Sequence, residues 1–352
     1  MKMTGAKMVV ESLHQEGVEV VFGYPGGAIM NVYDEIYKQN YFQHILNRHE
    51  QASIIAAEGY ARATGKVGVS IVTSGPGFTN AVTGLADAYM DSIPLVVISG
   101  QVPTTIIGSD GFQEIDAVGI SRPCTKHNYL VNNIEDLPRI IKEAFHIAST
   151  GRPGPVHVDI PKDITAQVAE FIYPSEINLP TYKPTVNYNK RQLKKAMEAI
   201  SNAKKPLLYV GGGAVLSNCS FEIRELAKRL NIPAVETLMA RGVMGDENPL
   251  FFGMLGMHGE FAANMAAHET DLLISLGARF DDRVTGRLDE FASKAKVIHV
   301  DIDPTSIAKL VVPDYPIVGD LKVTVKAMLE AIENGENEIN DYTNWVELLK
   351  DY

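Results

Sequence analysis

Residues 48–80 read RHEQASIIAAEGYARATGKVGVSIVTSGPGFTN, and this stretch decides the fold. Residues 52–63 are rich in alanine and place apolar side chains at helical spacing, which predicts a helix. Residues 67–72 are mostly β-branched and apolar, as is typical of a strand buried in a parallel sheet. A tight turn follows at residues 74–77, and residues 79–90 predict the next helix. The stretch therefore indicates an α/β fold in which strands and helices alternate.

Glu50 stands at the junction between a short predicted strand, residues 44–46, and the helix that follows. In a parallel sheet this junction lies at the carboxyl edge, where ligands bind. The turn Gly75-Pro76-Gly77 occupies the matching place one unit later. The sequence therefore predicts that an acid and a turn of bare backbone lie close together. Taken alone, Glu50 is more readily explained as an acid that complements the dipole of its helix.

Glu58 precedes Arg62 by four residues on the predicted helix. Side chains at this spacing are neighbours on one helix face. We therefore expect a surface ion pair between them and assign Glu58 no role in catalysis.

Composition and charge exclude several classes of function. The chain has 352 residues, a hydrophobic content of 45% and a formal net charge of −11, which argues against binding to nucleic acid. Cys124 and Cys219 lack CxxC spacing, so they indicate a reducing compartment rather than a disulfide framework or a zinc site. No apolar run approaches the roughly 20 residues that span a bilayer, and the start lacks the apolar core of a signal peptide. We expect a cytoplasmic protein with no membrane partner.

The alternation of strands and helices continues along most of the chain and predicts two doubly wound parallel-sheet domains. Residues 1–165 form the first domain, and the proline-rich, aperiodic residues 166–190 predict a linker. Residues 191–335 form the second domain, and the polar residues 336–352 are either a helix or a tail that leads onward. Further strands are predicted at residues 18–22, 94–99, 156–160, 206–210, 232–236, 271–276 and 297–301.

Several segments outside these elements are candidates for function. Residues 108–116 are polar and interrupted by glycine, which is typical of a functional loop. Lys126 and His127 could face solvent, and His157 is expected to be a packed strand residue. Residues 211–213 form a glycine turn that can cradle phosphate, but the full dinucleotide fingerprint, including its acid, is absent.

Three motifs taken together resemble the pyrimidine-binding domain of thiamine-diphosphate enzymes: residues 48–50, residues 57–62 and residues 73–77. In that family the acid matching Glu50 hydrogen-bonds the N1′ atom of the aminopyrimidine. This drives the ring to its imino tautomer, which generates the nucleophilic ylide. The protein tunes the cofactor, and the cofactor supplies the difficult chemistry.

Longer motifs narrow the resemblance to the large, catalytic subunit of acetohydroxyacid synthase (acetolactate synthase), from about residue 4 to residue 325. They are residues 23–27, 111–114, 125–127, 255–259 and, most specific of all, GARFDDRVTG at 277–286. The resemblance implies a pyrimidine-binding domain followed by a central, Rossmann-like FAD-binding domain. It implies decarboxylation of pyruvate and carboligation to a second 2-oxo acid, pyruvate or 2-oxobutyrate. The products would be 2-acetolactate or 2-aceto-2-hydroxybutyrate, precursors of branched-chain amino acids.

The same resemblance implies roles for individual residues. The catalytic residues would be Glu50 and Gln113. Residues matching contacts to thiamine diphosphate or FAD are Glu50, Gly26, Gly27, Pro76, Gly77, Asn80, Phe112, Arg152, His258, Gly259, Gly277, Arg279, Asp301, Asp303 and Asp320. Residues matching the substrate channel are Ala28, Pro103, Phe112, Lys162, Met257 and Asp282.

One departure from the family is large. The family's third domain holds the diphosphate through Mg²⁺ and is marked by Gly-Asp-Gly, which does not occur in this sequence. We therefore expect an amino-terminal portion that lacks the third domain, contains no metal ligands and does not turn over by itself. The resemblance also implies a homodimer or tetramer and a possible small regulatory subunit.

Three alternatives remain open. An FAD- and thiamine-diphosphate-dependent pyruvate oxidase or decarboxylase would share Glu50 and the second domain, although residues 126–127 and 281–283 favour the synthase. A non-catalytic dinucleotide-binding module would have kept only the fold, and Glu50 argues against it. An α/β scaffold of unrelated function would not explain the joint motifs.

Overall fold

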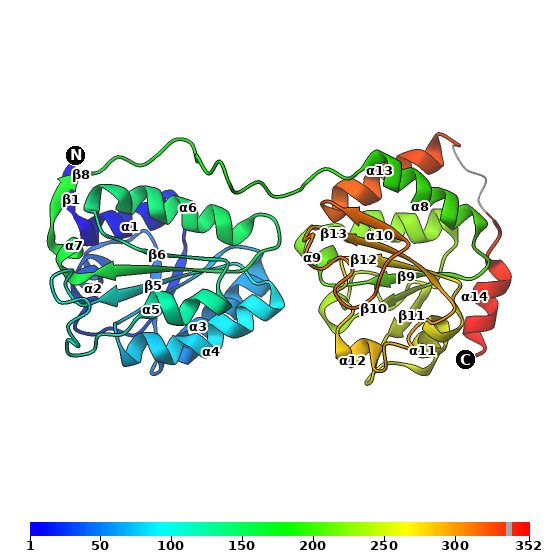
Figure 1. Cartoon of the computed structure of the whole chain (residues 1–352), viewed down its shortest axis with the longest axis horizontal. Helices are drawn as coiled ribbons and strands as arrows, with labels where there is room; N and C mark the ends of the chain where they lie inside the picture. The colour runs from blue at the N-terminus through cyan, green and yellow to red at the C-terminus, as the bar shows by residue number, and fades with distance from the viewer. Residues whose placement is uncertain (336–339) are drawn as a thin grey trace. The chain divides into compact units, whose positions relative to one another are not determined.

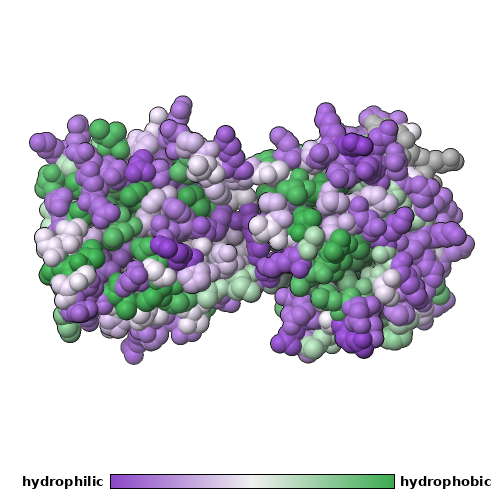
Figure 2. Space-filling view, in the orientation of Figure 1, coloured by the Kyte–Doolittle hydropathy of each residue, from purple (hydrophilic) through white to green (hydrophobic). Residues whose placement is uncertain are grey.

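The computed structural model describes residues 1–335 and 340–352, which divide into two compact units, Met1–Lys183 and Pro184–Tyr352 (Figure 1). Each unit is built on a six-stranded parallel sheet with helices on both faces. The predicted fold class, two doubly wound α/β domains, is confirmed. Within the described residues, none of the helices combines the length and apolar character that crossing a bilayer requires. Hydrophilic residues cover most of the surface visible in Figure 2.

The sheet of the first unit has the strand order β3-β2-β4-β5-β7-β6. From β2 the chain first runs outward to β3 and then returns to place β4 on the other side of β2. The crevice between the carboxyl ends of β2 and β4 is therefore the topological switch point of this sheet, where α/β proteins bind ligands. The strands are β2 (Val20–Gly23), β3 (Gln43–Leu46), β4 (Gly68–Val72), β5 (Leu95–Gln101), β6 (His127–Leu130) and β7 (Pro155–Pro161).

Helices cover both faces of this sheet, and β4, β5 and β7 are buried at every position, as expected for strands packed on two sides. Local signals set the helix ends: the Thr4 hydroxyl caps the first helix by accepting from the Lys7 amide at 3.2 Å, and Gly65 ends the third at a φ of +72°. The helices are α1 (Gly5–Gln15), α2 (Met30–Lys38), α3 (Glu50–Thr64), α4 (Pro76–Asp91), α5 (Ala117–Ser121), α6 (Leu137–Ser149) and α7 (Lys162–Ala166), with 3₁₀ turns at Arg122–Cys124 and Ile134–Asp136.

The first part of residues 166–190, the predicted linker, contains a strand. Strand β8 (Val168–Glu170) pairs antiparallel with β1 (Lys2–Thr4). Further along, the Tyr182 hydroxyl donates to the Thr150 carbonyl at 2.9 Å, which ties this segment to the end of α6. Three-residue strands and single tyrosine anchors leave no periodic signal, so the sequence pattern could not reveal them.

Lys126 does not simply face solvent. Its ammonium group donates to the Ile147 carbonyl, to the Thr150 carbonyl at 2.7 Å and to the Tyr182 hydroxyl at 3.0 Å. Ile147 lies in the last turn of α6 and Thr150 directly follows it, where a helix leaves acceptors unsatisfied and favours positive charge. Lys126 therefore caps α6, while His127 is exposed at the start of β6.

The second unit repeats the construction with the strand order β11-β10-β9-β12-β13-β14, all parallel. Its switch point lies between β9 and β12. The elements are β9 (Pro206–Val210), β10 (Ala234–Glu236), β11 (Phe251–Met254), β12 (Leu272–Leu276), β13 (Lys296–Asp301), β14 (Tyr315–Val318), α8 (Lys190–Asn202), α9 (Gly213–Leu216), α10 (Ser220–Leu230), α11 (Phe261–Glu269), α12 (Asp282–Thr285), α13 (Leu321–Glu333) and α14 (Thr343–Lys350), with a 3₁₀ turn at Leu238–Ala240.

The end of the chain packs onto the second unit. Residues 336–339 of the predicted tail lie outside the described residues, and α14 realises the helical alternative for the rest. Tyr342 donates its hydroxyl to the Ile200 carbonyl at 2.6 Å, and the Trp345 indole donates to the Pro206 carbonyl at 2.9 Å. Both aromatic side chains are buried, so α14 is part of the core of this unit.

A polar network is buried between β5 and β7 of the first unit. Ser99 Oγ lies 2.7 Å from His157 Nε2 and 2.5 Å from Asp159 Oδ1, and Ser121 Oγ lies 3.0 Å from His157 Nδ1. His157 also stacks on Phe78, so it is a packed strand residue as predicted. The group is not a hydrolytic triad, because the carboxyl contacts the serine rather than the histidine and the side chains are inaccessible to a substrate.

The protonation states in this network follow from burial and from the hydrogen bonds. Burial lowers the pKa of His157 to about 3 and raises the pKa of Asp159 to about 7, because a low-dielectric interior disfavours both charges. Ser99 has one hydroxyl proton and cannot donate to both neighbours. Ser99 donates its hydroxyl proton to Asp159 Oδ1 and accepts from Nε2 of the neutral His157 ring, so each of the two hydrogen bonds has one donor and one acceptor.

We expect the substitution Asp159→Asn to make the stability of the first unit depend on pH. In the wild type between about pH 4 and pH 6.5, unfolding protonates His157 and deprotonates Asp159, so no net proton is exchanged. Without Asp159, the unfolded state alone gains a proton on His157, and stability falls as pH decreases below 6.5, by up to about 1.4 kcal/mol per pH unit. Hydrogen exchange of the β5 and β7 amides from pH 4.5 to pH 7 measures this, and equal pH dependence in both proteins would contradict it.

Candidate functional site

Glu50 is the first residue of α3 and lies at the switch point of the first sheet. Its side chain is buried, with a residue exposure of 8%. The Asn80 side-chain amide donates to Glu50 Oε2 at 3.0 Å. Glu50 Oε1 has no hydrogen-bond partner within residues 1–335 and 340–352, and it lies 3.3 Å from the place where a Cβ on Gly77 would stand. One carboxyl oxygen is therefore fixed, while the other faces bare backbone.

Two glycine turns meet beside this carboxyl. A Cβ added to Gly26 or Gly77 would come within 2.5 or 2.6 Å of the Thr73 side chain. Thr73 Oγ1 in turn accepts from the Ala28 amide at 3.3 Å. The turns after β2 and β4 thus pack on Thr73, and side chains larger than hydrogen do not fit at these glycines. The predicted proximity of Glu50 to the Gly-Pro-Gly turn is observed, although α4 begins at Pro76 rather than at residue 79.

Gln113 reaches the same edge from the loop after β5. Its backbone has a φ of +60°, and a Cβ on Gly75 would lie 2.6 Å from the Gln113 carbonyl oxygen. Phe112 is 90% exposed. The structure therefore brings Gln113 against the turn that faces Glu50 and leaves the Phe112 ring in solvent.

The other site residues predicted in the first unit are spread along neighbouring elements. Ala28 is buried next to Gly100, whose added Cβ would lie 3.1 Å from the Ala28 Cβ. Pro103 follows β5 and Lys162 begins α7, where it is exposed. Arg152 lies between α6 and β7 and donates its Nε to Ser92 Oγ at 2.7 Å, so it is anchored at the end of α4.

The switch point of the second sheet is also lined by glycine. A Cβ on Gly211, after β9, would lie 2.3 Å from the Gly277 carbonyl oxygen, and a Cβ on Gly213 would lie 2.8 Å from Gly277 Cα. Gly277 has a φ of +68°, which favours glycine. Arg279 follows two residues later. Both turns therefore present bare backbone at the carboxyl ends of β9 and β12.

Three predicted aspartates stand at the same edge of this sheet and hold local backbone. Asp301, the last residue of β13, accepts from the Asp303 amide at 2.8 Å. Asp303 accepts from the Thr305 amide at 2.9 Å, and Asp320 caps α13 by accepting from the Val323 amide at 3.0 Å. These carboxylates are thereby fixed near the end of the sheet that carries the glycine turns.

The loops that carry His258 and Asp282 contact each other. The Met257 amide donates to the Arg283 carbonyl at 2.9 Å, and the Gly259 amide donates to the Gly256 carbonyl at 2.9 Å. Asp282 begins α12, and the side chains of Met257 and Asp282 are exposed. The two predicted channel residues of this unit therefore come from adjacent loops.

Sequence reasoning missed Glu236, the last residue of β10. The second strand of a dinucleotide-binding unit ends where an acid would meet a ribose, and Glu236 occupies that place. It is fully buried, and it accepts from the Met244 amide at 2.6 Å and the Gly242 amide at 3.2 Å. Burial raises the pKa of Glu236. The sequence signal for this residue was an acid at the end of an apolar strand. In the structure, its carboxylate binds the backbone of residues 242–244.

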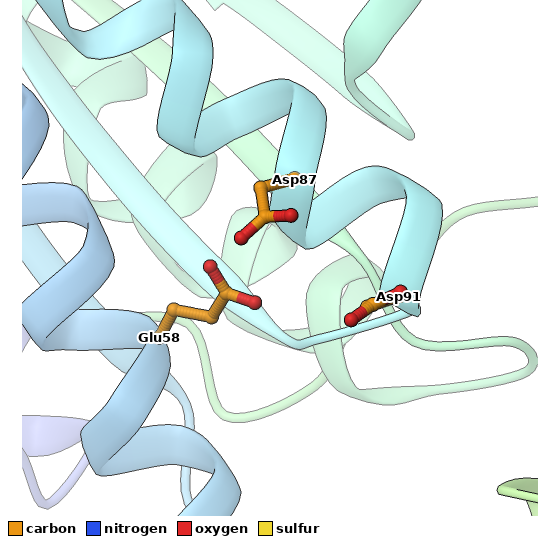
Figure 3. A group of neighbouring side chains, drawn as sticks. All are labelled: Glu58, Asp87 and Asp91. Carbon is orange, nitrogen blue, oxygen red and sulfur yellow. The ribbon is translucent and has the colours of Figure 1, made fainter. Parts of the chain in front are cut away.

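Glu58 pairs with Arg62 as predicted, but the pair is not a surface pair. Arg62 Nη2 lies 2.5 Å from Glu58 Oε1 and 2.6 Å from Asp91 Oδ2, and Glu58 is buried. Figure 3 shows the Glu58 carboxyl on α3 facing Asp87 and Asp91 on α4. Burial raises the pKa of Glu58. The Arg62 guanidinium compensates this carboxyl group and joins the two helices.

Comparison with known proteins supplies independent information. Residues 3–120 match the family described as the thiamine pyrophosphate enzyme N-terminal, TPP-binding domain, and residues 193–328 match the thiamine pyrophosphate enzyme central domain. The chain is 52% identical over 347 residues to the acetolactate synthase large subunit of Haemophilus influenzae, covering 98% of this chain and 61% of that protein.

Two further relatives carry related names. The acetolactate synthase isozyme 3 large subunit of Escherichia coli is 48% identical, over 99% of this chain and 62% of that protein. The acetolactate synthase of Mycobacterium leprae is 51% identical, over 98% of this chain and 55% of that protein. The chain thus spans about three fifths of the length of the curated relatives it matches.

We expect Arg62→Ala to destabilise the first unit by about 1–3 kcal/mol, because it leaves the buried Glu58 carboxyl without its partner. Arg62→Ala combined with Glu58→Gln should recover part of this loss, since the second change removes the uncompensated charge. Lys38→Ala is the control, because its pair with Glu35 is exposed and should contribute less than about 1 kcal/mol. Urea unfolding followed by circular dichroism measures all three, and a loss for Arg62→Ala no larger than the control would refute the assignment.

Proposed function

Because the chain belongs to the thiamine pyrophosphate enzyme family, in which it is homologous to large subunits of acetolactate synthase, we propose that it carries two domains of an acetolactate synthase. The observation that carries the proposal is the Glu50 carboxyl, which is buried at the switch point with one oxygen fixed by Asn80 and the other directed at bare backbone. The reaction is decarboxylation of pyruvate followed by carboligation to pyruvate or 2-oxobutyrate. The products serve branched-chain amino acid biosynthesis.

The first unit fits the aminopyrimidine of thiamine diphosphate. When bound, thiamine diphosphate supplies the nucleophilic carbon that attacks a 2-oxo acid. Glu50 would share a proton with a ring nitrogen, and Asn80 fixes the carboxyl by holding its other oxygen. Burial strengthens such a charge-assisted bond, because water does not compete for the carboxylate. Gly26, Gly27, Pro76 and Gly77 would let the backbone approach the ring closely.

The second unit fits a dinucleotide, which we propose is FAD. Gly277 and its neighbours place bare backbone at the switch point, where such ligands bind. Arg279 offers a planar set of donors suited to phosphate or carbonyl groups, and Asp301, Asp303 and Asp320 offer acceptors. His258 and Gly259 would add further contacts. Mg²⁺ would be bound through the diphosphate, and we assign it no ligand in this chain.

Four residues of the first unit and two of the second are proposed to contact substrate, and homodimers or tetramers with a small regulatory subunit are the proposed assembly. The six are Ala28, Pro103, Phe112, Lys162, Met257 and Asp282.

An FAD- and thiamine-diphosphate-dependent pyruvate oxidase or decarboxylase is the second candidate. The names of the similar proteins favour the synthase. A non-catalytic module has no use for the buried Glu50 carboxyl. Free, buried Cys124 and Cys219 are compatible with the cytoplasm.

We expect Glu50→Gln in the full-length protein to lower the rate of acetolactate formation by about 10²–10⁴-fold, the range typical of a lost acid–base group. The amide keeps the shape of the side chain but cannot share a proton with the pyrimidine. The control is Glu176→Gln, an exposed acid outside the site, which should keep full activity. A colorimetric assay measures acetolactate. A second assay measures peroxide, the product expected of the alternative oxidase. Wild-type acetolactate output from Glu50→Gln would disprove the role.

We expect Gly277→Ala to weaken binding of FAD to the chain at least about tenfold, since a Cβ there costs about 1–2 kcal/mol at positive φ and collides with Gly213. The matched control is Gly335→Ala, at the end of α13, where φ is +66° but a Cβ meets no atom within 4 Å. Both variants carry the same backbone strain, and only the first stands at the proposed site. Titration by flavin fluorescence measures the affinities. Equal affinities for the two variants would place the flavin elsewhere.

A further inference from the structure

The loop from Val102 to Asp116 carries Phe112 and Gln113 and is fastened at both ends. At its start, Thr104 donates its amide and hydroxyl to Asp163 at 2.9 and 2.6 Å. At its end, Gln101 Nε2 donates to the Ile115 carbonyl at 2.8 Å. These two anchors hold the ends of the loop, and neither contacts the residues between them.

Glu114 holds the middle of this loop. Its Oε2 accepts from the Gly111 amide at 2.7 Å, and its Oε1 accepts from the Gly108 amide. The Glu114 amide donates back to the Gly111 carbonyl at 2.9 Å. Hydrogen bonds from the Gly108 and Gly111 amides lower the pKa of the Glu114 carboxyl. Only a carboxylate can accept at two oxygens at once without presenting a donor.

The loop needs such a tie because its backbone is strained and its side chains are exposed. Asp110 and Gln113 adopt φ values of +58° and +60°, which cost about 1–2 kcal/mol each outside glycine. Phe112 is 90% exposed, so apolar burial does not hold it. The direction of the Phe112 and Gln113 side chains therefore depends on the backbone that Glu114 fixes.

We propose that Glu114 is a positioning residue for the reaction: it keeps the Gln113 backbone against Gly75 and so sets Gln113 and Phe112 beside the edge where Glu50 lies. The chain of contacts is short, since Gln113 packs on Gly75 and the same turn brings Gly77 to Glu50 Oε1. Glu114 itself contacts backbone of its own loop. The part that concerns the reaction rests on the proposed function, whereas the part that concerns the order of the loop does not.

The order of the loop is tested by limited chymotrypsin digestion of the chain, with cleavage after Phe112 quantified by mass spectrometry. Glu114→Gln replaces one acceptor oxygen with a donor group that opposes an amide. We expect cleavage at this site to accelerate at least fivefold while the thermal midpoint stays within about 2 °C of the wild type. Glu135→Gln removes an exposed acid at another surface and should digest like the wild type. Equal cleavage rates for wild type and Glu114→Gln would overturn the inference.

The effect on the reaction is tested in the full-length protein. We expect Glu114→Gln to lower kcat for acetolactate formation at least tenfold, because small misplacements of active groups cost about that much or more. The affinity for thiamine diphosphate should stay within about twofold, since Glu50 and Asn80 are untouched. A purely structural role would lower affinity and stability together with kcat, and a kcat within twofold of the wild type would refute positioning.

A second variant keeps the test decisive if Glu114→Gln does not fold. Glu114→Asp keeps the charge but is one methylene shorter, so it cannot span both amides. It should also accelerate cleavage after Phe112 and lower kcat, and unchanged values for both would count against the inference. Failure of the proposed function is distinguishable, because a wild-type protein that forms no acetolactate leaves the digestion result standing.

Discussion

The first unit depends on one constraint: the Glu50 carboxyl group is buried at the topological switch point of a parallel sheet. Withdrawing a carboxylate from solvent is expensive unless donors compensate for the lost hydration. Glu50 receives one such bond from Asn80 and stands at the start of α3, where the helix dipole favours negative charge. The glycine at position 77 then has an explanation, since a Cβ in its place would lie 3.3 Å from the second oxygen of Glu50.

The second unit uses the same topology for another purpose. Its switch point brings two glycine turns together around Gly277. Glu236 lies where a dinucleotide fold can have an acid that binds a ribose, but its carboxylate accepts hydrogen bonds from backbone amides instead. Acceptors at that edge come instead from β13 and the start of α13, through Asp301 and Asp320. The two units thus share a construction and differ in which strand end carries the polar group.

The long buried strands and the helices between them could be predicted from sequence, because apolar runs and helical spacing are properties of single segments. The proximity of Glu50 to residues 75–77 could also be predicted, since the carboxyl ends of parallel strands share an edge. The short strands β1, β6, β8, β11 and β14 were not predicted, because their pairing with a neighbouring strand, rather than a local sequence pattern, identifies them. The capping role of Lys126, the burial of Glu58 and the packing of Gln113 on Gly75 depend on segments that are distant in sequence and meet only in the folded unit.

The docking of α14 has a practical consequence. Trp345 is the only tryptophan of the chain, and it lies in the core of the second unit with the Lys205 ammonium 5.0 Å from its ring centroid. Indole emission selectively excited at long wavelength therefore reports on that unit alone, whereas far-ultraviolet ellipticity reports on both. The molecule carries a built-in optical label with which the melting of its two halves can be told apart.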